Sequence, residues 1–285
     1  MKYDLHMHTS FSDGEYSPQK LIERAYAENI EVISITDHDT VKAYKQLEKE
    51  KFECIKIIPG IEISTRTACF EEEYALHILG YNIDIHSQKL NEELNNLEII
   101  RMKEIKKVVK LLTEKVDNNI SVKNIICAKK KLTMNAIACY LSDIGYAKTK
   151  EDAYEKYLVA GKVAFVQKEC MTPEEAIQLI VDAGGIPVLA HPNRVNMTKD
   201  RMEHLIEHLA KCGLKGIECY CLYITDEEIR WYVTLCHKEN LWVSAGSDFH
   251  KPTDLIGLWR EENEISTRIQ PADGLLLIDV IGGIS

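Results

Sequence analysis

The chain alternates short apolar, β-branched segments with amphipathic helical patterns, and this alternation restricts the folds available to it. Residues 31–36 and 186–191 have strand-like patterns, and helical patterns follow them over residues 41–51 and 198–212. Further strand patterns cover residues 2–8, 55–64, 74–81, 216–220 and 241–245, and further helical patterns begin at Ser17-Pro18, Thr172 and Thr225. Repeated strand–helix units predict an α/β fold with a mostly parallel sheet, open or closed into a barrel.

The middle of the chain breaks the alternation. Residues 87–158 carry helical patterns alone, so we expect a small all-helical insertion there and an α/β domain made of residues 1–86 and 159–285. Because segments with candidate site residues flank the insertion, we expect it to overhang the site. Its lysines indicate either a solvated helix face or a cationic lid over an anionic substrate. These lysines are Lys103, Lys106, Lys107, Lys110, Lys115, Lys123 and the run Lys129-Lys130-Lys131.

Composition narrows the partners and the compartment. The formal net charge of −10 argues against a duplex DNA binder, but a local cationic site still allows a small phosphorylated substrate. The sequence shows neither a signal peptide nor an apolar stretch of about 18 residues, so we expect a cytoplasmic protein with no membrane span. The nine cysteines form no C-x-x-C pair and are expected to be reduced thiols.

Ionisable side chains gather where six of the predicted strands end. His6 and His8 are two residues apart on a strand and therefore face the same side. Glu62 lies between two isoleucines, and a buried carboxylate there needs a cation. The active site of a parallel α/β barrel is built at the carboxyl ends of its strands. The full set of candidates is His6, His8, Asp13, His38, Glu62, His77, His191, Asp248 and His250.

These nine side chains predict a metal centre. Mixed imidazole and carboxylate ligands without cysteine suit zinc, manganese or iron. Nine ligands exceed what one ion uses, so the sequence predicts two to three divalent metal ions, with Glu62 as the bridging ligand. Asp37 and Asp39 are candidates for holding His38 in its ligating tautomer.

The chain closely resembles the PHP (polymerase and histidinol phosphatase) family of metal-dependent phosphoesterases. The motifs that carry the resemblance occur in order outside the insertion: His6-x-His8 with Asp13, Thr36-Asp37-His38, Gly60-x-Glu62, His77, Ala190-His191-Pro192 and Ser247-Asp248-Phe249-His250. The resemblance implies a distorted (β/α)7 barrel and a trinuclear site. One metal would take His6, His8, Glu62 and Asp248, a second Glu62, His77 and His191, and a third Asp13, His38 and His250.

The resemblance also implies a substrate class. The subgroup with a helical insertion includes phosphatases of nucleoside 3′,5′-bisphosphates, some with 5′→3′ exoribonuclease activity on short RNA. That subgroup often carries Arg-Pro-His-Ile-Ala-Arg in the insertion, where this chain has Met134-Asn135-Ala136-Ile137-Ala138-Cys139. The lost arginines remove bidentate phosphate contacts. Arg194, Lys162 and Ser247 are the remaining candidate substrate-binding residues.

The expected reaction is hydrolysis of phosphate monoesters by a hydroxide that bridges the metals, with Glu62, Asp248 and His191 as the catalytic candidates. Three alternatives stay open. They are a phosphatase of the histidinol-phosphate type, an amidohydrolase-like reaction on the same metals, and a non-catalytic metal-binding module.

Overall fold

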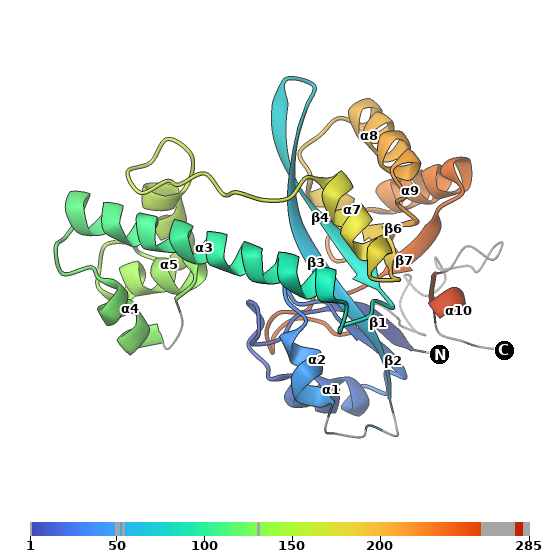
Figure 1. Ribbon diagram of the computed structural model, residues 1–285, viewed down its shortest axis with the longest axis horizontal. Helices are drawn as coiled ribbons and strands as arrows, with labels where there is room; N and C mark the ends of the chain where they lie inside the picture. The colour runs from blue at the N-terminus through green and yellow to red at the C-terminus, as the bar shows by residue number, and fades with distance from the viewer. Residues whose placement is uncertain (1, 49–51, 53–54, 130–131, 258–276, 282–285) are drawn as a thin grey trace. The chain divides into compact units, whose positions relative to one another are not determined.

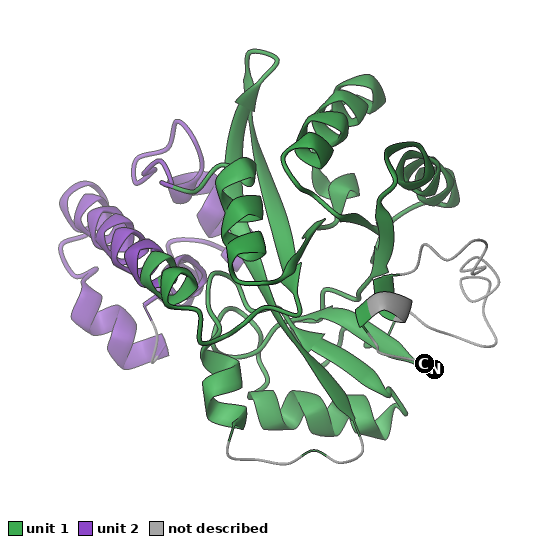
Figure 2. Cartoon of the chain, turned by 45° about the vertical axis from the view of Figure 1, so that its right-hand side comes forward, with its two compact units in different colours: residues 1–94, 170–285 green, residues 95–169 purple. Residues whose placement is uncertain are grey.

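The computed structural model describes residues 2–48, 52, 55–129, 132–257 and 277–281. It divides into two compact units, residues 1–94 with 170–285 and residues 95–169 (Figure 2). Lys130, Lys131 and Cys54 lie outside the described residues. No helix within the described ranges is long and apolar enough to cross a membrane.

The first unit contains a seven-stranded sheet whose strands neighbour one another in chain order (Figure 1). The neighbours β1, β2 and β3 are parallel, and so are β5, β6 and β7. A bridge between Met7 and Phe249 brings the two edges of the sheet together, which makes the barrel nearly closed. The strands are β1 (Tyr3–Met7), β2 (Val32–Ile35), β3 (Lys56–Cys69), β4 (Glu72–Tyr81), β5 (Ile186–Leu189), β6 (Gly216–Tyr220) and β7 (Trp242–Ala245). The predicted distorted barrel is confirmed.

Strand β4 departs from the parallel pattern. It runs antiparallel to both β3 and β5. Only Phe70 and Glu71 separate β3 from β4, and both have positive φ, 53° and 66°. A two-residue connection with two left-handed residues makes a tight hairpin, and a hairpin joins antiparallel strands. A turn without glycine or asparagine gives no sequence signal for this reversal.

Helices follow most of the strands of this unit, and side-chain caps fix where several of them begin. Thr172 and Thr225 each form a capping box with a glutamate three residues later, and Ser17 caps its helix by accepting from the Lys20 N–H. The helices are α1 (Pro18–Ala27), α2 (Lys42–Leu47), α7 (Pro173–Asp182), η2 (Pro192–Arg194), α8 (Lys199–Lys211), α9 (Asp226–Glu239) and α10 (Leu277–Ile281). The core consists of apolar strand residues such as Leu5, Ile33, Ile61, Ile78, Val188 and Ile217, all fully buried.

The second unit is helical over its described residues. Helix α3 (Gln88–Lys115) begins in the first unit and continues into the second, which also contains α4 (Val122–Lys129), α5 (Met134–Asp143), α6 (Lys150–Ala153) and η1 (Tyr154–Leu158). Its core includes Leu112, Ile125, Ile137 and Leu141, each with no exposed surface. That residues 87–158 act as a lid stays a prediction.

Candidate metal centre

The strand ends bring all nine predicted ligands into one cluster. The backbone places them there: the His8 N–H donates to Phe249 O, which ties β1 to the segment after β7, and the Asp39 N–H donates to the O of Glu62 in β3. Three groups of side chains each offer ligand atoms that lie within 4.8 Å of one another. They are His6, His8, Glu62 and Asp248; His8, Asp13, His38 and His250; and His38, Glu62 and His77. The ninth residue, His191, lies 2.9 Å from Glu62 through its Nε2.

Glu62 lies at the centre of the cluster, fully buried. Its Oε1 is 2.8 Å from His77 Nδ1 and 2.9 Å from His191 Nε2. Its Oε2 faces a different set of rings, at 3.3 Å from His6 Nε2, 3.2 Å from His8 Nε2 and 3.1 Å from His38 Nδ1. The two oxygens of one carboxylate thus face two sets of imidazoles, which is the arrangement of a bridging ligand.

The group formed by His6, His8, Glu62 and Asp248 is closed to solvent. His6, His8 and Glu62 have no exposed surface, and Asp248 is 6% exposed. Asp248 Oδ1 lies 3.3 Å from His6 Nε2 and 3.1 Å from His8 Nε2. Two imidazole nitrogens and two carboxylate oxygens converge here, which is a ligand set for one ion of the zinc, manganese or iron type.

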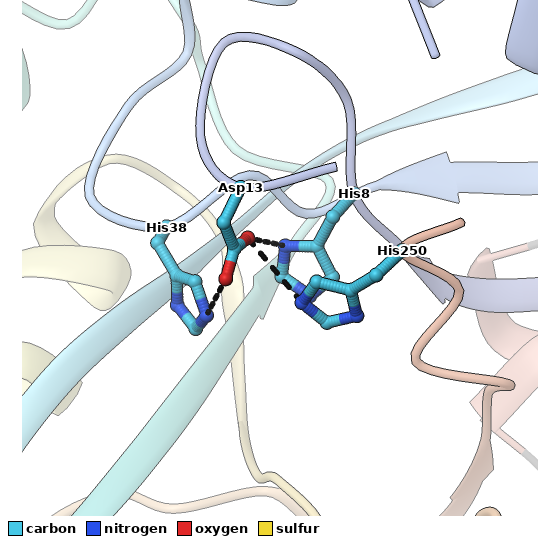
Figure 3. Close-up of side chains that lie close together, drawn as sticks. All are labelled: His8, Asp13, His38 and His250. Carbon is cyan, nitrogen blue, oxygen red and sulfur yellow. Dashed lines mark ion pairs between the residues drawn. The ribbon is translucent and has the colours of Figure 1, made fainter. Parts of the chain in front are cut away.

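The group around Asp13 is more open (Figure 3). Asp13 is 42% exposed, and its Oδ1 lies 3.3 Å from His250 Nε2 and 3.8 Å from His8 Nδ1. Its Oδ2 lies 3.9 Å from His38 Nε2. The separations from His8 and His38 are too long for hydrogen bonds, and all three distances suit ligands arranged around a central ion.

Buried polar atoms without partners show that the cluster fits metal ions. Among the described residues, Glu62 Oε2 and the Nδ1 atoms of His8, His38 and His191 are buried and have no hydrogen-bond partner. Leaving such groups unsatisfied costs about 1–3 kcal/mol each. Coordination would satisfy Glu62 Oε2, so the residues present fit the predicted cofactor.

The electrostatics of the cluster favour positive charge. Burial alone would lower the pKa of His8, yet Asp248 and Glu62 raise it to about 10. Burial alone would raise the pKa of Glu62, but His38, His6 and His77 hold it well below its ordinary value. Burial lowers the pKa of His38 to about 3, although the Glu62 carboxylate opposes this shift.

Three residues of the site adopt backbone conformations that are unusual for residues other than glycine. His191, Asp39 and Asp248 have φ values of 23°, 51° and 54°. Such conformations are costly and persist where the surrounding structure enforces them, often at functional sites. Here they turn His191 and Asp248 toward the cluster directly after β5 and β7.

Three buried carboxylates that are not predicted ligands also support the site. Asp4 accepts the N–H groups of His6, Ser247 and Gly257. Asp37 accepts from the Thr9 N–H and from the hydroxyls of Thr9 and Ser12. Asp37 therefore holds the loop that carries Asp13, whereas the sequence predicts that it orients His38. The third carboxylate, Glu218, contacts His6 and His191.

The predicted substrate-binding residues fall in different surroundings. Arg194 Nη1 lies 2.5 Å from Asp248 Oδ2, and the Arg194 side chain is 44% exposed, so this cation stands beside the cluster. Ser247 is buried directly before Asp248. Lys162 is exposed on the helical unit. The proximity of Arg194 agrees with a phosphate contact, while Lys162 has no such support.

Cys219, Cys221 and Cys236 are buried and form no disulfide bond. Cys219 Sγ lies 3.6 Å from Cys236 Sγ, and Cys221 Sγ lies 3.2 Å from Asn193 Oδ1. Burial raises the pKa of the Cys219 thiol well above its ordinary value. These three thiols thus behave as small core groups, in agreement with the expectation of reduced cysteines.

Comparison with known proteins places the chain among metal-dependent phosphoesterases. A model of the PHP domain matches residues 4–212. The chain is 32% identical to the 5′-3′ exoribonuclease Rnm of Escherichia coli over 263 residues, which cover 91% of this chain and 88% of that one. It is 27% identical to the 3′,5′-nucleoside bisphosphate phosphatase of Chromobacterium violaceum over 252 residues, 87% of each chain. A solved structure described as an amidohydrolase from Chromobacterium violaceum, with bound sulfate and no metal, is 26% identical and has a TM-score of 0.79, covering 96% of this chain and 99% of that one.

Proposed function

Because the chain belongs to the PHP domain family of metal-dependent phosphoesterases, we propose that it hydrolyses phosphate esters of nucleotides, such as nucleoside 3′,5′-bisphosphates or short oligoribonucleotides. The observation that carries this proposal is the position of Glu62. One buried carboxylate faces His77 and His191 with one oxygen and three other imidazoles with the second. This geometry supports at least two adjacent metal positions, which a phosphoryl group can span.

The cluster has a closed side and an open side. His6, His8 and Glu62 are fully buried, whereas the side chains of His77, His250 and Asp13 are 27%, 29% and 42% exposed. A phosphate ester would therefore approach from the side of Asp13 and His250. Metal ions bound here would lower the pKa of a water molecule and offset charge on the phosphoryl group.

In this proposal the residues of the chain hold the metals and orient the substrate. Glu62, Asp248 and His191 act through the metals that they hold, and their rigid backbone surroundings keep the ligand atoms in place. Arg194 lies against Asp248 and can turn its remaining N–H groups to a phosphate oxygen. This pairing gives the substrate a cationic contact at the edge of the metal centre.

The nucleotide preference is proposed from the relatives, which act on RNA or on nucleoside bisphosphates by name. The stretch Met134–Cys139 lies in α5, where Ala136, Ile137 and Ala138 are buried in the core of the helical unit. Met134 and Cys139 stand where the related subgroup has arginines, and both are half-buried. A second phosphate would need other cations, so we propose a shifted or weaker preference for bisphosphates.

A panel of phosphate esters with purified, manganese-supplemented protein tests the proposal. Release of inorganic phosphate should be fastest from adenosine 3′,5′-bisphosphate or a short oligoribonucleotide, slower from p-nitrophenyl phosphate, and slowest from histidinol phosphate. Faster turnover of histidinol phosphate than of every nucleotide would reverse the proposed ranking. The proposal fails if metal-replete protein releases no phosphate from any ester.

Hydrolysis at carbon is the second candidate, because the solved structure with a TM-score of 0.79 is described as an amidohydrolase. The imidazole and carboxylate ligands are compatible with that chemistry as well. Adding small amides and lactones to the panel separates the two. Turnover of these compounds without phosphate release from any ester would favour the second candidate.

A further inference from the structure

Glu218 is a fully buried carboxylate on β6 that the nine predicted ligands do not include. Its Oε1 lies 2.9 Å from His6 Nδ1, and its Oε2 accepts the backbone N–H of His191 at 2.8 Å. Gly246 leaves room for the first contact. A Cβ atom there would lie 2.2 Å from His6 Cβ and 2.9 Å from Glu218 Oε1. Both oxygens are therefore engaged with residues that face Glu62.

The contact with His6 determines which ring nitrogen carries the proton. A carboxylate can only accept, so His6 Nδ1 must donate to Glu218 and the neutral ring then keeps its lone pair on Nε2. That Nε2 lies 3.1 Å from His8 Nε2, 3.3 Å from Glu62 Oε2 and 3.3 Å from Asp248 Oδ1. Glu218 thus selects the tautomer in which His6 offers a ligand atom to the buried group.

The contact with His191 holds its backbone. His191 has φ 23° and ψ 60°, a conformation that a residue other than glycine avoids unless it is held. Its N–H is fixed by Glu218, while its Nε2 lies 2.9 Å from Glu62 Oε1. His6 faces the other oxygen of Glu62, Oε2. One carboxylate consequently orients two imidazoles that face opposite oxygens of the same bridging residue.

We propose that Glu218 is a positioning residue that holds His6 and His191 in the conformations in which they would bind metal, by fixing the tautomer of His6 and the backbone of His191. The proposal rests on the metal-dependent function proposed above. A positioning role differs from a merely structural one, because Glu218 would then affect metal affinity in addition to folding.

The variant Glu218→Gln keeps the size of the side chain but has one acceptor oxygen and one NH₂ group. Either the His191 N–H then meets a donor, or His6 must accept at Nδ1 and carry its proton on Nε2, where it blocks coordination. We expect the dissociation constant for Mn²⁺ or Co²⁺ to rise by about 10- to 100-fold. The visible spectrum of the Co²⁺-loaded protein should change as well, because the geometry of the ligands changes.

The matched control is Glu104→Gln. Glu104 is also a buried carboxylate that accepts a backbone N–H, from Glu169, but it belongs to the helical unit. The control should unfold at a lower temperature yet bind Co²⁺ with unchanged affinity and an unchanged spectrum. The proposal is overturned if Glu218→Gln binds metal as tightly as the wild type, or if Glu104→Gln loses the same affinity.

A measurement on the wild type keeps the proposal testable if Glu218→Gln does not fold. Long-range ¹H–¹⁵N spectra of histidine-labelled, Zn²⁺-loaded protein report the tautomer of each ring, with His6 assigned by its loss in His6→Gln. His6 should carry its proton on Nδ1, and a proton on Nε2 would overturn the proposal. Metal binding is read here without substrate. Wild-type protein that binds metal but releases no phosphate would refute the proposed function alone.

Discussion

The two units of the chain bury polar groups in opposite ways. At the strand ends of the barrel unit, carboxylates and imidazoles are packed together with no exposed surface, among them His6, Glu62 and Glu218. In residues 95–169 the core is made of residues such as Leu112 and Ile137, and Glu104 is the one buried carboxylate among the described residues. The helical core is satisfied by its own contacts, whereas the barrel cluster needs a cation. The difference supports the proposal that the metal centre lies in the barrel.

The largest effect is expected from removing the metal, which should affect the barrel unit and leave the helical unit unchanged. Chelation should abolish phosphate release and destabilise the barrel, while the helical unit keeps its structure. At free metal about 100 times the dissociation constant, binding contributes roughly 2.7 kcal/mol of stability. Trp231 and Trp242 lie in the barrel unit and residues 95–169 contain no tryptophan, so the fluorescence of these two side chains reports unfolding of the barrel unit.

Elemental analysis before and after chelation provides the control. Protein supplemented with metal should hold two to three ions per chain, and adding Mn²⁺ back should restore activity. One ion or fewer in the supplemented protein would contradict the multinuclear centre.

The next largest effect is expected for Glu62→Gln, which removes the charge that two metal positions would share. Turnover should fall by about 10³-fold or more, because metal ions supply several kcal/mol of transition-state stabilisation. Metal content should fall at more than one position. Elemental analysis and phosphate release measure both quantities, and Glu104→Gln is again the control. A Glu62→Gln variant with wild-type activity would show that this carboxylate has only a structural role.

These predicted effects concern residues that the sequence already singles out. His6, His8, Glu62 and His77 are recognisable because an ionisable side chain within an apolar strand is costly without a partner. Glu218 also lies in an apolar strand, but its role depends on the approach of β1 to the segment after β7, which brings His6 past Gly246 to Glu218. No local pattern in the sequence reveals this approach.

The antiparallel direction of β4 and the ion pair of Lys129 could not be predicted from the sequence either. The turn at Phe70 and Glu71 uses side chains that rarely adopt positive φ, so the hairpin carries no turn signal. Lys129 appears in the sequence as part of a cationic run, but in the structure it pairs with Asp143 and is 23% exposed. The hairpin depends on backbone conformations that these residue types rarely adopt, and the ion pair depends on the packing of α4 against α5.

A smaller effect is expected for Arg194→Lys, which probes the edge of the metal centre. Lysine keeps the charge but loses the planar fork that contacts two phosphate oxygens. The KM for a nucleotide substrate should rise about 10- to 100-fold, since hydrogen bonds to charged groups are worth roughly 1.5–3 kcal/mol. Metal content should be unchanged. If kcat falls at an unchanged KM instead, Arg194 acts on Asp248 rather than on the substrate.

The smallest effect is expected from the lysines of the helical unit, which test whether that unit takes part in substrate selection at all. Neutralising Lys129, Lys130 and Lys131 together should raise the KM for adenosine 3′,5′-bisphosphate a few-fold, roughly the 1 kcal/mol of a solvent-exposed ion pair. The KM for p-nitrophenyl phosphate should not change, because that ester offers a single phosphate to the metals. Lys129 already pairs with Asp143, which limits its contribution.

Neutralising Lys110 is the control. Lys110 pairs with Glu114 within α3, so this variant separates the effect of the run from a general loss of positive charge. If both substrates respond equally, or neither responds, the run is only a solvated helix face. The helical unit would then take no part in substrate selection through these lysines.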